Sequence, residues 1–225
     1  MIRLVKEERP RTVLAVGDAA LTAARKVRGI PVETILSLAF NLQKQPPEHI
    51  GGVTMAVSPV EYLKMFREME TKRIGVLYDP ARTGRYLNHA VTQARQSGIT
   101  LVPVEVNRSS ELPAAISTLT GKIDGFWVIP DGTIVTSINM EVIASFSISN
   151  NLPLFSFTPQ HLKIGAVASL STDNTDIGRQ AGEMITGQLK GNIADSQPVT
   201  EPRKIIRNTN NAVLNKLKQR LIGIK

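Results

Sequence analysis

Apolar runs and helix-spaced apolar positions alternate along almost the whole chain. Short, nearly continuous apolar stretches predict buried strands, and stretches with apolar residues three or four positions apart predict amphipathic helices. The predicted strands are Thr12–Val16, Ile30–Leu38, Arg73–Tyr78, Thr100–Val106, Gly125–Ile129, Leu152–Phe157, Ile164–Ser169 and Lys204–Arg207, and Gly51–Val57 is either a short strand or a crossing segment. The predicted helices are Ala19–Val27, Pro59–Met69, Arg85–Gln96, Glu111–Leu119, Asn139–Ser147, Asp176–Leu189 and Asn211–Leu221. Strands buried on both faces and separated by helices predict an α/β fold with parallel sheets.

Two local patterns refine this prediction. Ser58 precedes Pro59 and has Glu61 three residues further on, which is a capping-box arrangement with proline at the first helical position. The polar, proline-containing stretch Gly191–Pro202 is expected to be a connector.

Composition limits the classes of protein that remain. The chain has 225 residues and 42% hydrophobic content, which is enough for one larger domain or two small lobes. It has no cysteine, so disulfides, thiolate metal sites and thiol nucleophiles are excluded. Charges interrupt the first residues, and no stretch has the length of a signal-peptide core or a membrane span. As written, the chain is expected to be cytoplasmic unless an export segment was removed.

The net charge of +8 raises the question of nucleic-acid binding. The basic residues are dispersed, however, and only Lys216–Arg220 near the end is dense. A solvated basic surface is therefore preferred, and no nucleic-acid partner is expected.

The chemical motifs of common enzymes are missing from the sequence. The glycines form neither a dinucleotide fingerprint nor a P-loop, and there is no nucleophile elbow. His49, His89 and His161 lack metal-ligand spacing, so neither a metal nor another cofactor is expected. Asp79 and Asp131 remain as a carboxylate pair that an enzyme could use. Without a nucleophile and base, binding is favoured over catalysis.

In open parallel α/β sheets, ligands bind outside the carboxyl ends of the strands. The residues that follow the predicted strands are small, polar and neutral or acidic, which suits a small polar ligand with an ammonium group. For each aspartate or threonine the alternative role is that of a helix N-cap. The set comprises Gly17, Asp18, Ala19, Asp79, Pro80, Thr83, Gly84, Asn107, Arg108, Pro130, Asp131, Gly132, Thr133, Thr158 and Pro159.

Several of these segments resemble one protein family in their order along the chain. They include GDAALTAAR, GGVTMAVSPVEYLKMF, KRIGVLYDPARTG, GFWVIPDGTIV, LPLFSFTPQHLKIGAVASLS and DIGRQAGEMITGQLKG. Over nearly its whole length the chain resembles the ABC-transporter substrate-binding proteins of the type I periplasmic-binding fold, in the group similar to tryptophan- and tyrosine-binding transport proteins. GAVAS followed by the DxGRQA helix is fairly specific for the fold, and PDGTIVTS is more specific for the family.

The resemblance implies two lobes of parallel sheet flanked by helices, with a small ligand held between them. Residues 1–56 and 173–195 would form the first lobe, and residues 57–172 and 196–225 the second. A full first lobe would begin with two further βα units, so the N-terminal lobe is expected to be incomplete. An incomplete lobe leaves a bare sheet edge, which predicts a homodimer through that lobe.

The resemblance also implies a set of ligand-binding residues. In the family, an acidic or aromatic residue often follows the strand that corresponds to Leu152–Phe157, and here Phe157 and Thr158 stand there. Family members often carry a tyrosine where this chain has Asn174, and this departure argues against an aromatic amino acid as the ligand. The implied set is Asp18 and Ala19 on the first lobe, Ser58 near the crossing, and Asp79, Thr83, Asp131, Thr133, Phe157 and Thr158 on the second lobe.

The function implied is that of the solute-binding component of an ABC importer, which binds an amino-acid-like molecule and delivers it to an ABC permease. The resemblance places such a protein in the periplasm or at the cell surface. The alternative is a cytoplasmic small-molecule sensor domain of the same fold, and a helix-turn-helix ahead of the first lobe would distinguish it. None is visible in the sequence.

Overall fold

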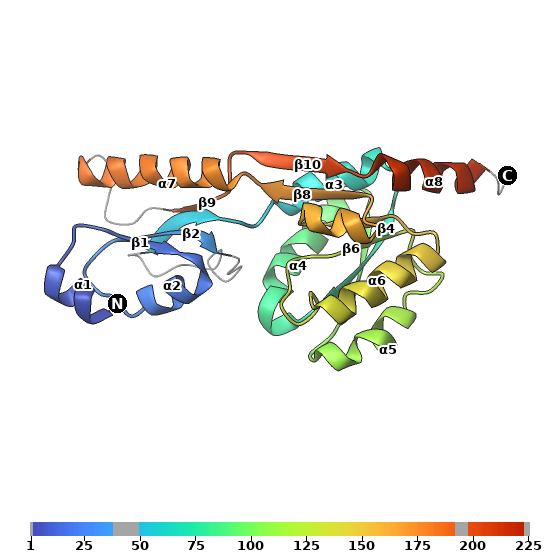
Figure 1. Cartoon of the computed structure of the whole chain (residues 1–225), viewed down its shortest axis with the longest axis horizontal. Helices are drawn as coiled ribbons and strands as arrows, with labels where there is room; N and C mark the ends of the chain where they lie inside the picture. Colours follow the sequence, from blue (N-terminus) through green and yellow to red (C-terminus); the bar gives the residue numbers. More distant parts are fainter. Residues whose placement is uncertain (1, 38–49, 192–197, 223–225) are drawn as a thin grey trace. The chain divides into compact units, whose positions relative to one another are not determined.

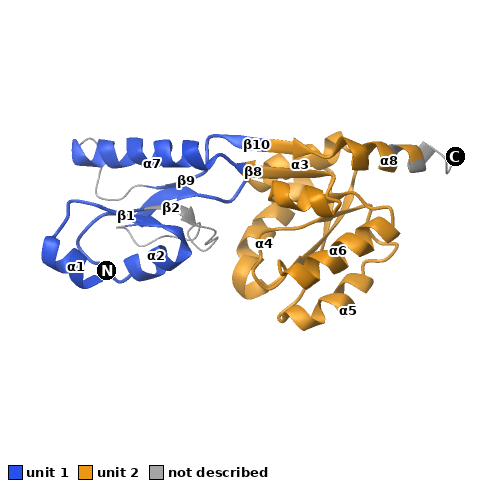
Figure 2. Ribbon diagram, in the orientation of Figure 1, with its two compact units in different colours: residues 1–57, 172–206 blue, residues 58–171, 207–225 orange. Residues whose placement is uncertain are grey.

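The computed structural model of the chain describes residues 2–37, 50–191 and 198–222. It divides into two compact units (Figure 2). Unit 1 contains residues 1–57 and 172–206, and unit 2 contains residues 58–171 and 207–225. The chain therefore passes from one unit to the other three times.

Unit 1 is built on a four-stranded sheet with the order β1-β2-β3-β9. Its strands pair in parallel, with Val13 opposite Val32 at the first interface. The helix α7 covers one face, and α1 and α2 lie on the other (Figure 1). The bounds are α1 (Ile2–Glu8), β1 (Val13–Val16), α2 (Gly17–Ala24), β2 (Val32–Ser37), β3 (Ile50–Thr54), α7 (Asn174–Leu189) and β9 (Val199–Thr200).

The apolar residues of this sheet alternate between its two faces, as strand geometry requires. Val32 and Ala15 pack with Leu21 of α2 on one side. On the other side, Ile35 packs with Ile177 of α7. Each helix therefore covers a different set of strand residues.

Unit 2 is built on a six-stranded sheet with the order β10-β8-β7-β6-β4-β5. The strands β5, β4, β6, β7 and β8 pair in parallel, so their carboxyl ends lie at one edge. The bounds are α3 (Pro59–Glu68), β4 (Arg73–Tyr78), α4 (Pro80–Gln96), β5 (Thr100–Glu105), η2 (Ser109–Glu111), α5 (Leu112–Ser117), β6 (Gly125–Trp127), α6 (Ser137–Ser149), β7 (Leu154–Ser156), η3 (Pro159–Ile164), β8 (Ala168–Thr172), β10 (Ile205–Thr209) and α8 (Asn211–Ile222).

Helices cover both faces of this sheet as well. Tyr62 and Phe66 of α3 and Tyr86 of α4 surround Trp127, with the Tyr62 and Trp127 ring centroids 4.7 Å apart. Phe126, the neighbour of Trp127 on β6, packs instead in the cluster formed with α5 and α6. The predicted α/β class with parallel sheets flanked by helices is confirmed.

Two predicted boundaries within unit 2 are wrong. Helix α4 begins at Pro80, five residues before the predicted start, because Asp79 caps it and proline is favourable in the first turn. The predicted strand Ile164–Ser169 is displaced. The 3₁₀ helix η3 ends at Ile164 and is followed by Gly165, whose φ of 105° lies in the left-handed region, and β8 then begins at Ala168.

The predicted connector and second lobe also need correction. Val199 and Thr200, inside the predicted connector, form β9 and pair with β3. The Gln180 amide group also donates to the Thr200 hydroxyl and to the Glu201 carbonyl, both at 3.1 Å. These bonds attach residues 198–206 to unit 1, whereas the sequence had placed 196–225 in the second lobe.

The predicted capping box at α3 is not formed. Ser58 does precede the helix and Pro59 is its first residue, but the Ser58 side chain makes no capping hydrogen bond. The Glu61 carboxylate instead accepts from the Lys64 ammonium group at 2.6 Å. Within the described ranges, every helix is too short or too polar to cross a membrane.

Candidate functional site

The loops that follow β4 and β6 are joined by a closed hydrogen-bond network. The Asp131 carboxylate accepts from the Asp79 backbone N–H at 2.8 Å and from the Thr83 hydroxyl at 2.5 Å through Oδ2. Its Oδ1 accepts from the Thr133 N–H at 2.9 Å. The Thr133 hydroxyl in turn donates to Asp79 Oδ2 at 2.7 Å. Four of the predicted residues therefore lie together at the carboxyl edge of the unit 2 sheet.

This network is largely internal to the protein. Asp131 and Thr83 are each 1% exposed and Asp79 is 7% exposed. The Asp79 carboxylate also caps α4 by accepting from the Ala81 N–H at 2.9 Å. The helix-cap role that sequence left open for Asp79 is therefore real, and the two carboxylates chiefly hold two loops together.

The N-terminus of α4 has little capacity to bind an anion. Pro80 has no N–H, the Ala81 N–H is bound to the Asp79 side chain, and the N–H groups of Arg82 and Thr83 are bound to the Asp79 carbonyl. A helix N-terminus binds phosphate through backbone N–H groups that are still free. A phosphate site in this turn is therefore excluded for these four residues.

Arg82 lies on the outer side of the network. Its Nε is 3.5 Å from Asp79 Oδ2, and its side chain is 61% exposed. The guanidinium also lies close to Gly132, where an added Cβ would be 3.2 Å from Nη1. An exposed cation therefore lies at this edge, a feature that the sequence did not indicate.

A second polar cluster follows β7 and includes the predicted residues Phe157 and Thr158. The Ser156 Oγ is 2.6 Å from His161 Nδ1, and the Phe157 ring meets the His161 ring edge-on, with centroids 5.5 Å apart. Ser156 is fully buried and His161 is half-buried. Burial lowers the pKa of His161 below its ordinary value, so the ring is neutral at pH 7. Sequence reasoning missed this pair because Ser156 belongs to an apolar strand.

The remaining predicted residues lie elsewhere. Asp18 and Ala19 are exposed in the first turn of α2 in unit 1, and the Asp18 carbonyl accepts from the Thr22 hydroxyl at 2.8 Å. Ser58 is the half-buried first residue of unit 2. His49 lies outside the described residues. Within those residues, no three histidine, aspartate or glutamate side chains are grouped as metal ligands.

Unit 1 contains a buried acid that the sequence analysis did not single out. Glu33 on β2 is fully buried, and one carboxylate oxygen accepts from the Gln188 amide of α7. The other oxygen, Oε2, has no hydrogen-bond partner among the residues that the structure describes. Burial raises the pKa of Glu33 to about 7, against a smaller lowering by the Gln188 hydrogen bond.

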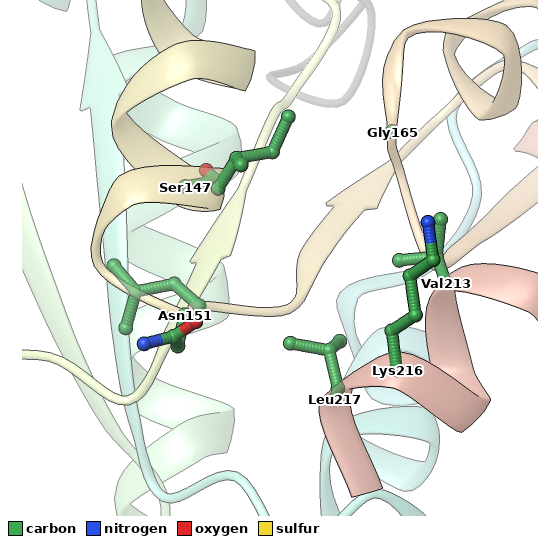
Figure 3. Close-up of a pocket in the computed structure, with 8 residues that line it drawn as sticks. Ser147, Asn151, Gly165, Val213, Lys216 and Leu217 are labelled. Carbon is green, nitrogen blue, oxygen red and sulfur yellow. The ribbon is translucent and has the colours of Figure 1, made fainter. Parts of the chain in front are cut away.

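A pocket of about 210 Å³ opens in unit 2 away from these groups (Figure 3). Side chains of α8 face the C-terminal end of α6 across it. None of the nine predicted ligand residues lines it, so it is not the predicted site. Its lining residues are Ser147, Ile148, Asn151, Leu152, Gly165, Val213, Lys216 and Leu217.

Comparison with known proteins identifies a family and a curated relative of this chain. Residues 1–221 match the model of the family described as "ABC transporter substrate binding protein". A tyrosine-binding protein of Clostridioides difficile (strain R20291) is 28% identical over 174 residues, which are 76% of this chain and 49% of that protein. The chain therefore spans about half the length of this curated relative. The family description names a binding role rather than a reaction, as the sequence analysis predicted.

Solved structures share the fold. The ABC domain of Streptococcus pneumonia in complex with L-Trp has a TM-score of 0.71 at 21% identity and covers 97% of this chain and 77% of its own. A ligand-free, open structure of a substrate binding protein with adhesive properties from Clostridium difficile has a TM-score of 0.72 at 21% identity, with 96% and 76% covered. The predicted type I periplasmic-binding fold is thereby confirmed.

Proposed function

Because the chain belongs to the ABC transporter substrate-binding protein family, we propose that it is the solute-binding component of an ABC-type importer and binds a small amino-acid-like molecule without altering it. The single observation that carries the proposal is the family match over residues 1–221. The relative named for tyrosine binding supports an amino acid as the class of ligand. The role includes delivery to an ABC permease, outside the cytoplasm in the periplasm or at the cell surface.

The geometry of unit 2 supports a binding role. The Asp79–Asp131 network fixes the loops after β4 and β6, so the side chains around it are held in place before a ligand arrives. A preorganised site loses less conformational entropy on binding. The proposed site residues remain the nine expected from the sequence. Among them Asp131 and Thr83 would act by holding the loops, since they are almost fully buried.

A thermal-shift screen tests the proposal. The purified chain is heated with each of the common amino acids, and one of them is expected to raise the midpoint progressively with concentration. At one hundred times its dissociation constant, a ligand adds about 2.7 kcal/mol to the free energy of unfolding. No shift with any amino acid at millimolar concentration would contradict the proposal.

One variant localises the site in the same screen. Thr158→Ala removes the hydroxyl of a half-buried residue beside Phe157, which donates to the Gln160 side-chain oxygen in the structure, and is expected to reduce the shift from the bound amino acid. Thr92→Ala is the matched control, because Thr92 is exposed on α4 and its hydroxyl donates to the Asn88 carbonyl one turn earlier. Equal shifts for wild type and Thr158→Ala would place the ligand elsewhere.

We also propose that a second copy of the chain covers the outer part of the unit 1 sheet. Within the described residues β1 pairs only with β2, which leaves it as an edge strand. Leu14 and Val16 lie on the α7 face beside Glu33 and Ile35, yet they are 46% and 52% exposed. An apolar edge strand is a template for pairing with another chain.

Light scattering tests this association. The mass of the wild-type chain is expected to rise with concentration, and Leu14→Lys is expected to keep it a monomer. Ile138→Lys is the control, because Ile138 is 75% exposed but lies in unit 2. A wild-type chain that is a clean monomer at high concentration would contradict the proposal.

A further inference from the structure

The Ser156–His161 pair differs from the other polar groups at the carboxyl edge of the unit 2 sheet. In the Asp79–Asp131 network, the donors and acceptors of the two loops satisfy one another. The His161 ring, in contrast, makes its hydrogen bond through Nδ1, and Nε2 has no hydrogen-bond partner among the described residues. Among the described residues, the buried side-chain atoms that lack a partner do not include Nε2, so this nitrogen is accessible to solvent. The ring therefore keeps one hydrogen-bonding position open.

The surroundings of Ser156 determine which ring nitrogen carries the proton. The Ser156 Oγ accepts from the Thr158 N–H at 3.4 Å and lies 2.6 Å from His161 Nδ1. The buried Ser156 hydroxyl can therefore donate its hydrogen to Nδ1. The opposite arrangement, with Nδ1–H donating to Oγ, would leave a buried hydroxyl without an acceptor, which costs about 1–3 kcal/mol. The hydrogen-bond network thus assigns the proton to Nε2.

The ring is also fixed in orientation. The backbone carbonyl of His161 accepts from the Ala166 N–H at 3.0 Å, and the backbone N–H of His161 donates to the Thr158 carbonyl at 3.3 Å. The Phe157 ring stands at 85° to the imidazole and packs against it edge-on. A buried serine, a backbone turn and an aromatic edge therefore hold one N–H in a defined direction. The neutral state of the ring at pH 7 agrees with this arrangement.

We propose that His161 Nε2–H is a ligand contact that donates a hydrogen bond to the carboxylate of the bound amino acid, and that Ser156 is the positioning residue that fixes this donor. The inference rests on the proposed function and adds to it a specific residue and the group it recognises. A protonated Nε2 can only donate a hydrogen bond, so it requires an acceptor on the ligand. A carboxylate oxygen makes a stronger bond than a neutral oxygen because it is charged. An amine without the carboxylate would not make this contact.

The binding experiment uses L-tyrosine and L-tryptophan as probes, with tyramine and tryptamine as their carboxylate-free counterparts. By calorimetry, His161→Asn is expected to weaken binding of the amino acids about 10- to 100-fold, because asparagine can replace Nδ1 but not Nε2. Binding of the two amines is expected to be unchanged. His161→Gln, whose amide nitrogen lies near the position of Nε2, should recover part of the loss. His89→Asn on the exposed face of α4 is the control.

The proton on Nε2 is measured without any ligand by ¹⁵N NMR of the imidazole rings, with His161→Asn identifying the signal. The Nε2–H tautomer is expected in the wild type, and Ser156→Ala should populate the Nδ1–H tautomer. An Nδ1–H or a charged ring in the wild type at pH 7, or His161→Asn affinities within about twofold of wild type, would overturn the inference while leaving the proposed function intact. If no amino acid binds the wild type, the proposed function fails and this inference fails with it.

Discussion

Replacing Asp131 with asparagine is expected to lower the free energy of unfolding by about 3 kcal/mol. The wild-type carboxylate is 1% exposed and accepts from the Asp79 N–H, the Thr83 hydroxyl and the Thr133 N–H. Asparagine has the same shape but turns one oxygen into an NH₂ group. That group would face a donor, so at least one buried N–H or hydroxyl would lose its acceptor and two donors would come into close contact.

Urea unfolding measures this loss. Asp124→Asn is a suitable control, because Asp124 also accepts two backbone N–H groups, from Lys72 and Arg73, but is only half-buried. Water can replace the lost acceptor there, so a loss of about 1 kcal/mol or less is expected. If Asp131→Asn unfolds within about 0.5 kcal/mol of the wild type, the network does not hold the two loops together.

Replacing Glu33 with glutamine is expected to stabilise the protein at pH 8 by about 1–3 kcal/mol and to change little at pH 5. Burial raises the pKa of Glu33 in the folded chain from its ordinary value of 4.5 to about 7. Between these values the folded state holds a proton that the unfolded state has lost, so wild-type stability falls as the pH rises from about 4.5 to about 7 and then levels off. Glutamine removes the buried charge and keeps a partner for Gln188.

The measurement compares unfolding of the wild type and Glu33→Gln at both pH values. Glu183→Gln is the matched control, because Glu183 lies on α7, is exposed and pairs with Arg203 at the surface. Relative to the wild type, Glu33→Gln should show a higher free energy of unfolding at pH 8, and this gain should be smaller at pH 5. A gain of equal size at both pH values, or a loss at pH 8, would show that the Glu33 carboxylate is not a buried charge in the folded chain.

The fold follows closely from the sequence pattern. Runs such as Arg73–Tyr78 are apolar along almost their whole length, and only a strand covered on both faces buries them all. The predicted start of α4 was wrong because the loop-like residues before it suggested a later start than the helix cap gives. Thr83 and Gly84 resemble a loop, yet both are buried in α4, whose start is set by the Asp79 cap and Pro80. The two residues of β9 were too short a strand to recognise.

The candidate site was predictable in composition and position but not in its bonding. Asp79, Thr83, Asp131 and Thr133 were expected near one another, because each follows a parallel strand and such strands end at one edge. The sequence could not show that Asp131 would be enclosed and Asp79 would keep the outer position beside Arg82. That outcome depends on how the loop after β4 packs against the loop after β6.

By itself, the sequence determined the alternation of strands and helices and the parallel sheets, because periodic burial is a local property of the chain, while the family was indicated by the resemblance of its motifs. Only the tertiary structure decided which polar groups pair. The bonds between Asp79 and Asp131 join residues 52 positions apart, and the bond between Gln188 and Glu33 joins residues 155 apart. Such partners meet through sheet register and helix packing, so whether an aspartate, glutamate or histidine is enclosed or keeps an open hydrogen-bonding position appears only in the folded chain.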